Sequence, residues 1–339
     1  MILATRGSRL ALAQTEIVKR KLEKLGEKVE LLIVNTKGDK DRKSELTKIG
    51  GDGLFIRELE KAVLEGRADA AIHSTKDLPY ELMDGLMIAS VPDEADPRDV
   101  IVTRKGELFR LNALLLETSL PSLVEKGSGI RKPKLIIGTG SPRRKAELMK
   151  LIDSKSNINV MGNGKDDRAV GLDTQIELAN IRGNVDTRLK KLREGEYDAI
   201  VLAKAGLDRL GYGLSDGQLS EDFDFYILDT KNFIPSPCQG LLAAECRKTD
   251  ERTRSLLEAI NDDHAMLRFN TEREIFGKLK VDCSVPVGIY AEIPEALNYS
   301  EIRMPEDILG INISEENVNA GKNIEIFLML DGEKRKLNI

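Results

Sequence analysis

Cysteine and histidine are both scarce in this chain of 339 residues. Three cysteines, Cys238, Cys246 and Cys283, are too few for a disulfide framework and are typical of a protein in a reducing cytoplasm. Two histidines, His73 and His264, leave little material for a histidine-based metal site or a Ser-His-Asp triad. We therefore expect a cytoplasmic protein that holds no metal.

Long apolar runs are also missing, because no stretch approaches the ~18 consecutive apolar residues of a membrane helix. The segment before Arg6 is too short for a signal peptide. The formal net charge of −5 argues against nonspecific binding to nucleic acid. A hydrophobic content of 41% and a charged content of 32% describe an ordinary globular protein, of roughly two or three domains at this length. We expect neither a nucleic acid nor a membrane as a partner.

A helix followed by a strand leads into the segment His73 to Pro79. Leu54 to Glu65 has apolar residues at helical spacing, and Ala68 to Ile72 is a short run of small residues that suits a buried parallel strand. Lys76 and Asp77 follow this strand, at the edge where open α/β sheets bind ligands. The pair is therefore a candidate site, and the alternative is a charged turn in solvent.

Two pairs of similar segments indicate an internal repeat. Ser8 and Ser141 each lie between a predicted strand and a predicted helix. Glu65 to Ala70 is similar to Glu194 to Ala199, at nearly the same separation along the chain. Two lobes of like construction explain both pairs, and facing α/β lobes enclose a cleft in which a ligand can bind.

Arginine recurs beside small residues at the predicted strand ends. Arginine binds carboxylates in a bidentate fashion and stays charged, so the pattern predicts a polycarboxylate or phosphate ligand between the lobes; the alternative is a solvated basic face. The glycine-rich run Gly138 to Arg143 lacks the third glycine of a dinucleotide site and the ending of a P-loop. The arginines concerned are Arg6, Arg143, Arg144, Arg182, Arg188 and Arg209.

Polar, proline-containing segments predict where the chain passes between lobes. Asp93 to Asp99 is the expected crossover into the second lobe, and Pro235 to Gly240 is the expected return. Asp153 to Gln175 has no clear periodicity and is interpreted as a loop insertion. A basic amphipathic helix, His264 to Leu279, begins a third domain. The predicted domains are residues 1–97 with 238–260, residues 98–237, and residues 261–339.

Two segments resemble one known family, the porphobilinogen deaminases or hydroxymethylbilane synthases. They are His73-Ser74-Thr75-Lys76-Asp77-Leu78-Pro79 and Cys283-Ser284-Val285-Pro286-Val287-Gly288, and the resemblance extends from Ala4 to about Tyr290. It implies an α/β fold of two lobes like type II solute-binding proteins plus a small α+β C-terminal domain. It also implies a monomeric enzyme of tetrapyrrole and heme biosynthesis that joins four porphobilinogen units head to tail, with loss of ammonia, onto a covalent dipyrromethane cofactor.

The resemblance also implies roles for individual residues. Asp77 matches the catalytic aspartate, and Cys283 matches the cysteine that holds the cofactor by a thioether. The positions that match cofactor-binding residues are Lys76, Ser141, Arg143, Arg144, Arg182 and Arg188, and those that match substrate-binding residues are Arg6, Ser8 and Arg209.

The chain departs from the family pattern at a few positions. Asp52 replaces a lysine and is expected to be a helix N-cap. Val281 and Asp282 stand where glycines are usual, and no closing helix is evident at the C-terminus. Of the other cysteines, we expect Cys246 to be buried in a strand and Cys238 to be a possible exposed thiol.

Two other functions fit part of the pattern. A noncatalytic two-lobed protein that binds an organic polyacid explains the arginines but gives Asp77 and Cys283 no role. A thiol enzyme with Cys283 as nucleophile has only His264 nearby in sequence as a base.

Overall fold

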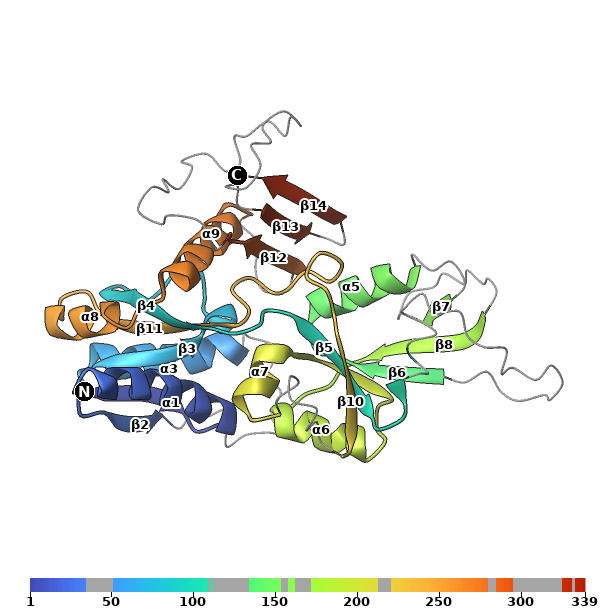
Figure 1. Ribbon diagram of the computed structural model, residues 1–339, viewed down its shortest axis with the longest axis horizontal. Helices are drawn as coiled ribbons and strands as arrows, with labels where there is room; N and C mark the ends of the chain where they lie inside the picture. Colours follow the sequence, from blue (N-terminus) through green and yellow to red (C-terminus); the bar gives the residue numbers. More distant parts are fainter. Residues whose placement is uncertain are drawn as a thin grey trace.

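The computed structural model describes residues 1–34, 51–108, 111, 134–153, 158–161, 172–212, 221–279, 285–294, 325–330 and 333–338. Within these residues the chain forms three β-sheets with helices packed on them (Figure 1). No helix in this part of the chain is long and apolar enough to span a membrane.

The first sheet has the strand order β2-β1-β3-β11-β4. β1 is parallel to β2 and β3, whereas β11 is antiparallel to both of its neighbours. Helices α1 and α8 cover one face and α3 covers the other, because alternate strand residues pack on opposite sides. The elements are β1 (Ile2–Arg6), α1 (Arg9–Lys24), β2 (Glu30–Val34), α3 (Gly51–Leu64), β3 (Ala70–Ser74), β4 (Leu86–Glu94), β11 (Leu241–Arg247) and α8 (Glu251–Glu258).

The second sheet has the order β10-β5-β9-β6-β8-β7. β6, β8 and β9 are parallel where they pair, and β5 is antiparallel to β9 and β10. Helix α5 packs on one face, and α6 and α7 pack on the other. The elements are β5 (Asp99–Arg104), β6 (Lys134–Gly138), α5 (Pro142–Asp153), β7 (Ile158–Met161), β8 (Leu172–Ala179), α6 (Val185–Arg193), β9 (Ala199–Ala203), α7 (Lys204–Arg209) and β10 (Phe223–Ile227).

The internal repeat is visible in matching hydrogen bonds. In the first sheet the Asp69 carboxylate accepts from the amide of Ile2 at 2.6 Å, just before β3 begins. In the second sheet the Asp198 carboxylate accepts from the amide of Ile136 at 2.8 Å, just before β9 begins. In each lobe, therefore, an aspartate fixes the register of two parallel neighbouring strands. The prediction of two lobes of like construction is confirmed.

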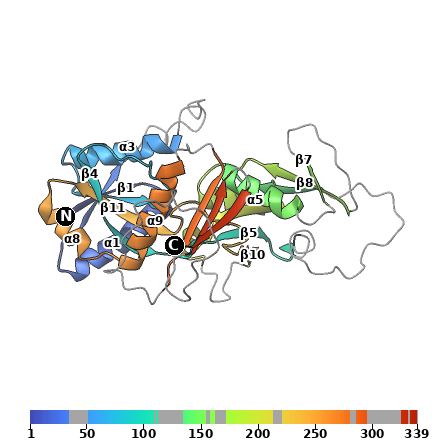
Figure 2. The same ribbon diagram turned by 90° about the horizontal axis from the view of Figure 1, so that it is seen from above.

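The third sheet, β12-β13-β14, is antiparallel and lies over the junction of the two lobes (Figures 1 and 2). Its strands are β12 (Val287–Glu292), β13 (Glu325–Leu330) and β14 (Glu333–Asn338). Helix α9 (Asp263–Leu279) packs Ile275 against β12 and Phe269 against the first lobe. The helix expected from His264 is thus present, but its Arg268 is buried rather than part of an exposed basic face.

Some expectations were wrong in detail. Residues 153–175, interpreted as a loop insertion, contain β7 and the start of β8, two parallel strands at the sheet edge, where short strands carry little periodic signal. Asp52 is the second residue of α3, not its N-cap. The crossover predicted from Asp93 to Asp99 is shorter, because β4 extends to Glu94 and β5 begins at Asp99. The predicted domain boundaries lie in connections between elements and stay a prediction.

Candidate functional site

Lys76 and Asp77 lie in a short 3₁₀ helix, Thr75–Asp77, directly after β3. The hydroxyl of Thr75 is buried and contacts the carbonyl oxygens of Cys238 at 2.5 Å and Leu241 at 2.9 Å, which ties this turn to the chain that returns from the second lobe. Asp77 is exposed and Lys76 is half-buried. His73, by contrast, lies in the core with its Nε2 2.9 Å from a Glu245 oxygen. The turn therefore presents the aspartate carboxylate outward from a fixed backbone.

The electrostatic surroundings of Lys76 come from both lobes. Burial is the main cause that lowers the pKa of Lys76, with Asp77 opposing it, and the net pKa is about 8. The cations Arg144 and Arg143 contribute to this lowering, while Asp99 opposes it. Arg143, Arg144 and Asp99 belong to the second lobe. The structure therefore brings Lys76, of the first lobe, into the electrostatic field of two of the arginines predicted to bind the ligand.

Arg143 and Arg144 lie in the first turn of α5 and share one buried carboxylate, that of Asp99. Arg143 Nη2 donates to Asp99 Oδ2 at 2.6 Å, and Arg144 Nη2 donates to Asp99 Oδ1 at 2.8 Å. Their remaining Nη1 groups donate to the carbonyls of Ile234 at 2.6 Å and Val201 at 3.0 Å. Side-chain exposure is 5% for Arg143, 8% for Arg144 and 0% for Asp99. The two arginines thus form a buried scaffold and are not free side chains in solvent.

Two buried carboxylates face the two arginines. Burial raises the pKa of Asp99, but the two guanidiniums and their hydrogen bonds outweigh burial and hold that pKa well below its usual range. The carboxylate of Glu147, one turn further along α5, is also buried and acts electrostatically on Arg143. Arg143 Nε is buried and has no hydrogen-bond partner among the described residues. An acceptor beside this N–H group is therefore favoured.

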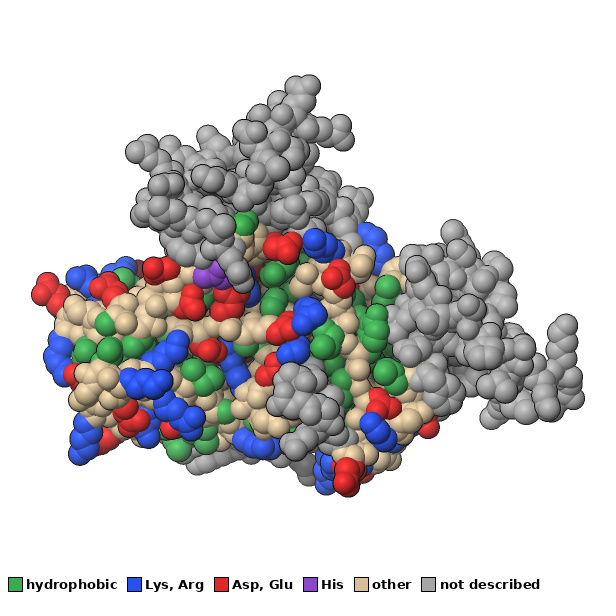
Figure 3. Space-filling view, in the orientation of Figure 1, with side chains coloured by type: hydrophobic (Ala, Val, Ile, Leu, Met, Phe, Trp, Pro, Cys, Tyr) green, Lys and Arg blue, Asp and Glu red, His purple; other side chains and the backbone are tan. Residues whose placement is uncertain are grey.

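The positive charge is hidden rather than displayed. On the face seen in Figure 3, blue cationic and red anionic side chains are interspersed over both lobes. The residues of the cluster, by contrast, are buried where the two sheets meet at the crossovers. These charges therefore do not contribute to the exposed surface.

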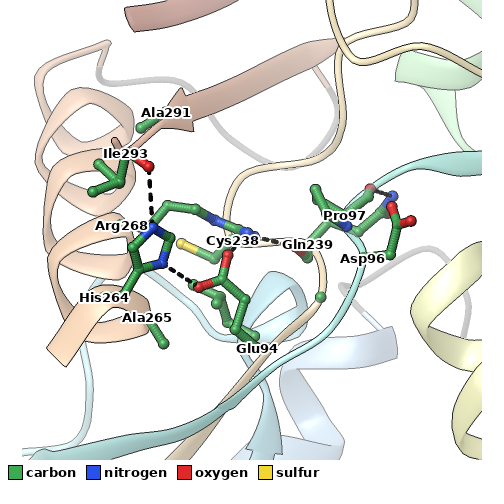
Figure 4. A network of polar contacts seen from close by, with 12 residues as sticks. Glu94, Asp96, Pro97, Cys238, Gln239, His264, Ala265, Arg268, Ala291 and Ile293 are labelled. Atoms are coloured by element: carbon green, nitrogen blue, oxygen red, sulfur yellow. Dashed lines mark hydrogen bonds and ion pairs between the residues drawn. The ribbon is translucent and has the colours of Figure 1, made fainter. Parts of the chain in front are cut away.

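Gln239 connects the arginine cluster to the third domain. Its side-chain amide donates to Asp99 Oδ1 at 2.9 Å and to the carbonyl of Pro97 at 2.6 Å. The backbone carbonyl of Gln239 accepts a hydrogen bond from Arg268 of α9 (Figure 4). Sequence reasoning missed both Asp99 and Gln239. The available signal was an aspartate directly before the apolar run of β5, since a charge next to a buried strand needs a partner.

Two predicted serines are helix caps. Ser8 accepts a hydrogen bond from the amide of Ala11 at 3.2 Å and begins α1. Ser141 accepts from the amide of Arg144 at 3.3 Å and begins α5. Both helix N-termini follow parallel strands, so their remaining amides favour an anion at the sheet edge. Arg6 is half-buried at the end of β1.

The other predicted arginines have different surroundings. Arg182 is exposed, and Arg188 donates to the carbonyl of Gly183 at 2.8 Å at the start of α6. Arg209 is 6% exposed and donates to Asp93 at 2.7 Å and to the carbonyl of Gly240 at 2.6 Å. Arg209 therefore joins the second lobe to the first, and a role in substrate binding stays a prediction.

The three cysteines differ. Cys283 lies outside the described residues. Cys246 is fully buried, as expected, and burial raises the pKa of its thiol to about 11. The expectation of an exposed Cys238 was wrong, because its residue is 1% exposed and burial raises its thiol pKa. It lies under α9 next to the buried Glu272, whose carboxylate accepts from the Cys238 amide. Figure 4 shows Cys238 beside Arg268.

His264, the base considered for a thiol enzyme, has partners of its own. Its Nδ1 lies 2.7 Å from a Glu94 oxygen and its Nε2 lies 3.1 Å from the carbonyl of Ile293 (Figure 4). Burial lowers the pKa of His264, but these two hydrogen bonds reverse the effect, and the net pKa is raised. The imidazole is therefore a link between the first lobe and the third domain.

Comparison with solved structures finds similar chains at low identity. The substrate-binding protein of an amino acid ABC transporter matches with a TM-score of 0.37 and 13% identity, covering 82% of this chain and 99% of that chain. A methionine-binding protein matches with a TM-score of 0.37 and 12% identity, covering 81% and 95%. The two-lobed α/β architecture is established by the strand order described above.

Comparison of sequences is more informative. Residues 1–255 match a family model described as "Porphobilinogen deaminase, dipyromethane cofactor binding domain". A porphobilinogen deaminase of Brevibacillus brevis is 36% identical over 293 residues, which cover 86% of this chain and 79% of that protein. A probable porphobilinogen deaminase of Archaeoglobus fulgidus is 35% identical over 331 residues, covering 96% and 97%. The chain therefore belongs to the porphobilinogen deaminase family.

Proposed function

We propose that this chain is a hydroxymethylbilane synthase, a transferase that joins four porphobilinogen units with release of ammonia. One observation carries the proposal. Lys76, next to the exposed Asp77, lies in the electrostatic field of Arg143 and Arg144, a buried pair that shares the carboxylate of Asp99. A pyrrole that bears an acetate and a propionate has the groups that such a site binds, namely a ring N–H and two carboxylates.

Asp77 acts on the reacting ring in this proposal. Its carboxylate accepts a hydrogen bond from the pyrrole N–H and stabilises the cation that forms when ammonia leaves. The same carboxylate relays the proton that the attacking ring loses as it becomes aromatic again. An aspartate that is exposed at the end of a rigid strand can do this without reorganising its surroundings.

The cations bind and orient the acidic side groups. Lys76 supplies an ammonium beside Asp77, and the N–H of Arg143 Nε, which has no partner among the described residues, is a donor for a carboxylate. The same donor set fits the acidic side groups of a dipyrromethane. We propose that Lys76, Ser141, Arg143, Arg144, Arg182 and Arg188 hold this cofactor and that Arg6, Ser8 and Arg209 contact the incoming substrate.

Cys283 would hold the dipyrromethane by a thioether, and the bound group would supply the terminal pyrrole carbon to which the first substrate is added. Cys283 follows α9 closely in the chain, and α9 is packed against the first lobe. The helix that precedes Cys283 in the chain is therefore anchored to the lobe that carries Asp77. We further propose that the protein works as a cytoplasmic monomer.

Intact-mass analysis combined with Ehrlich's reagent tests the proposal. Protein expressed with ample porphobilinogen is expected to be heavier than its sequence by two linked pyrrole units, to react with the reagent, and to convert porphobilinogen to a linear tetrapyrrole. Cys283→Ala should show the bare mass and no turnover, whereas Cys246→Ala should keep the adduct. A wild-type protein with the bare mass and no turnover would instead fit a polyacid-binding protein or a thiol enzyme.

A further inference from the structure

One face of helix α9 lies against the loop that follows Asp77. Phe269, Arg273 and Gly277 are spaced four residues apart in the helix, so they form one row on its surface. Arg273 and Gly277 of this row face the ring of Tyr80, the last residue of the loop, which is 50% exposed. A helix of the C-terminal part of the chain thus contacts the loop that carries the proposed catalytic carboxylate.

A single guanidinium contacts three consecutive carbonyl groups of this loop. Arg273 Nη2 donates to the carbonyl of Pro79 at 2.7 Å and to that of Tyr80, and its Nη1 lies 3.4 Å from the carbonyl of Leu78. Proline fixes one backbone angle of the loop, and the arginine fixes the directions of the carbonyls around it. The backbone that follows Asp77 is therefore held by a donor from another part of the chain.

The same guanidinium is stacked between two aromatic rings. It lies 5.4 Å from the centroid of Tyr80 and 5.6 Å from that of Phe269. A cation over an aromatic face is attracted to it, most strongly where the group is partly shielded from water, and Arg273 is half-buried. The rings therefore keep the guanidinium in the one place from which it reaches the three carbonyls.

Gly277 provides the space for the Tyr80 ring. A Cβ atom built at Gly277 would overlap the ring, so no other residue type allows the ring to lie directly on the helix backbone. Glycine inside a helix is less favourable than alanine. Its presence in the middle of this contact therefore has a packing reason.

We propose that Arg273 is a positioning residue for Asp77. By holding the loop against α9, it keeps the carboxylate at a fixed place relative to the part of the chain that leads into Cys283. Loops have conformational freedom that a well-placed catalytic group must lose, and a displacement of about 1 Å can cost a large part of the rate. This inference rests on the proposed function.

Kinetics of Arg273→Ala, Arg273→Lys and the control Arg252→Ala test the inference. Arg252 is an exposed arginine of α8 paired with Glu27, so its loss should leave the rate unchanged. For Arg273→Ala we expect at least a tenfold lower kcat, a KM within twofold of wild type, and a retained dipyrromethane adduct by intact mass. Arg273→Lys should restore part of the lost kcat, because an ammonium reaches carbonyls but cannot donate to them as a fork. A wild-type kcat in Arg273→Ala would overturn the inference.

Hydrogen exchange provides a readout that does not need activity. The amides between Thr75 and Tyr80 should exchange at least tenfold faster in Arg273→Ala and in Gly277→Ala than in wild type and in Arg252→Ala. In Gly277→Ala the half-exposed ring can swing into solvent, so this variant is expected to fold even if Arg273→Ala does not. Unchanged exchange in both variants would overturn the inference. If wild type does not turn over porphobilinogen, the proposed function fails, and the exchange experiment still decides whether Arg273 holds the loop.

Discussion

The two lobes are built alike, and an arginine at one end of each sheet shows how closely. In the first lobe Arg247 of β11 donates to the carbonyls of Val63 at 2.5 Å and Ala68 at 2.9 Å, where α3 turns into β3. In the second lobe Arg104 of β5 donates to the carbonyls of Leu192 at 3.2 Å and Tyr197 at 2.7 Å, where the chain passes from α6 to β9. Each arginine also lies near the register-fixing aspartate described above, at 3.9 Å and 3.6 Å.

The chain reaches this likeness by different routes. β5 comes early in the second lobe, whereas β11 comes late and returns to the first lobe after the second is complete. The two sheets exchange chain segments through two crossovers, and Gln239 and Pro97 lie side by side there. The crossovers are therefore a region that both lobes share.

The lobes differ in the chemistry that follows the matching strands. β3 is followed by Lys76 and an exposed Asp77, whereas β9 is followed by Lys204, which pairs with Asp208 at 2.5 Å. The second lobe instead contributes buried guanidiniums at the start of α5. In the proposed function, one lobe thus supplies a carboxylate for the reaction, and the other supplies arginines for binding. The same scaffold serves two tasks because only the residues after the strands differ.

The largest expected effect comes from removing the counter-ion of the second lobe. Asp99→Ala leaves two buried guanidiniums without their carboxylate and should lower the free energy of unfolding by about 3–5 kcal/mol. Urea denaturation measures this change. Asp96→Ala, which removes a more exposed carboxylate that pairs with Arg98, should cost no more than about 1 kcal/mol. Equal losses in the two variants would mean that Asp99 is not the charge that keeps the arginines buried.

The next effect separates the two lobes by activity. Asp77→Asn should lower kcat by ~10²-fold or more, since the amide keeps the shape but cannot stabilise a cation. Because Asp77 is exposed, the melting temperature and the bound dipyrromethane should be unchanged. Asp208→Asn changes the carboxylate that follows the matching strand of the second lobe and should leave the rate nearly unchanged. Near wild-type turnover in Asp77→Asn would remove this carboxylate from the mechanism.

Much of the fold could be predicted because it depends on local patterns. The helix predicted from Leu54 to Glu65 on its apolar spacing lies within α3 to its last residue, Leu64, and Gly66 after it has the positive φ typical of such a helix end. β8 and β10 could not be predicted in this way. Their residues are only partly apolar, and their pairing depends on neighbours distant in sequence.

The site was predicted by residue type but not by partner. A pattern of arginines indicates an anion, yet it does not show which cations the protein neutralises itself. Asp99 was assigned to a polar crossover because it follows Pro97 and Arg98, whereas in the structure it is the first residue of a buried strand. Likewise, Cys238 was expected to be a possible exposed thiol because it lies in the predicted return crossover, whereas the packing of α9 buries it.

A smaller effect tests the structural likeness of the lobes. Arg247→Leu and Arg104→Leu each remove hydrogen bonds from a guanidinium to two carbonyls and should each lower the free energy of unfolding by about 1–2 kcal/mol. Arg247 also donates to the Asp250 carboxylate at 2.6 Å, so Arg247→Leu should have the larger loss of the two. The losses should add in the double variant, because the two arginines share no partner. A larger loss in Arg104→Leu than in Arg247→Leu would show that the repeat is one of geometry and not of stability.

The smallest effect is a pH dependence that comes from Lys76 alone. Burial lowers its pKa to about 8, so its positive charge is complete below that pH and is lost as the pH rises through it. If Lys76 binds a carboxylate of the ligand, the KM for porphobilinogen should begin to rise near pH 8. Lys76→Arg stays charged throughout this range, so its KM should remain flat to higher pH even if it is weaker overall. Assays from pH 7 to 9.5 with both proteins cancel the ionisation of the substrate itself, and parallel curves would assign the rise to the substrate and not to Lys76.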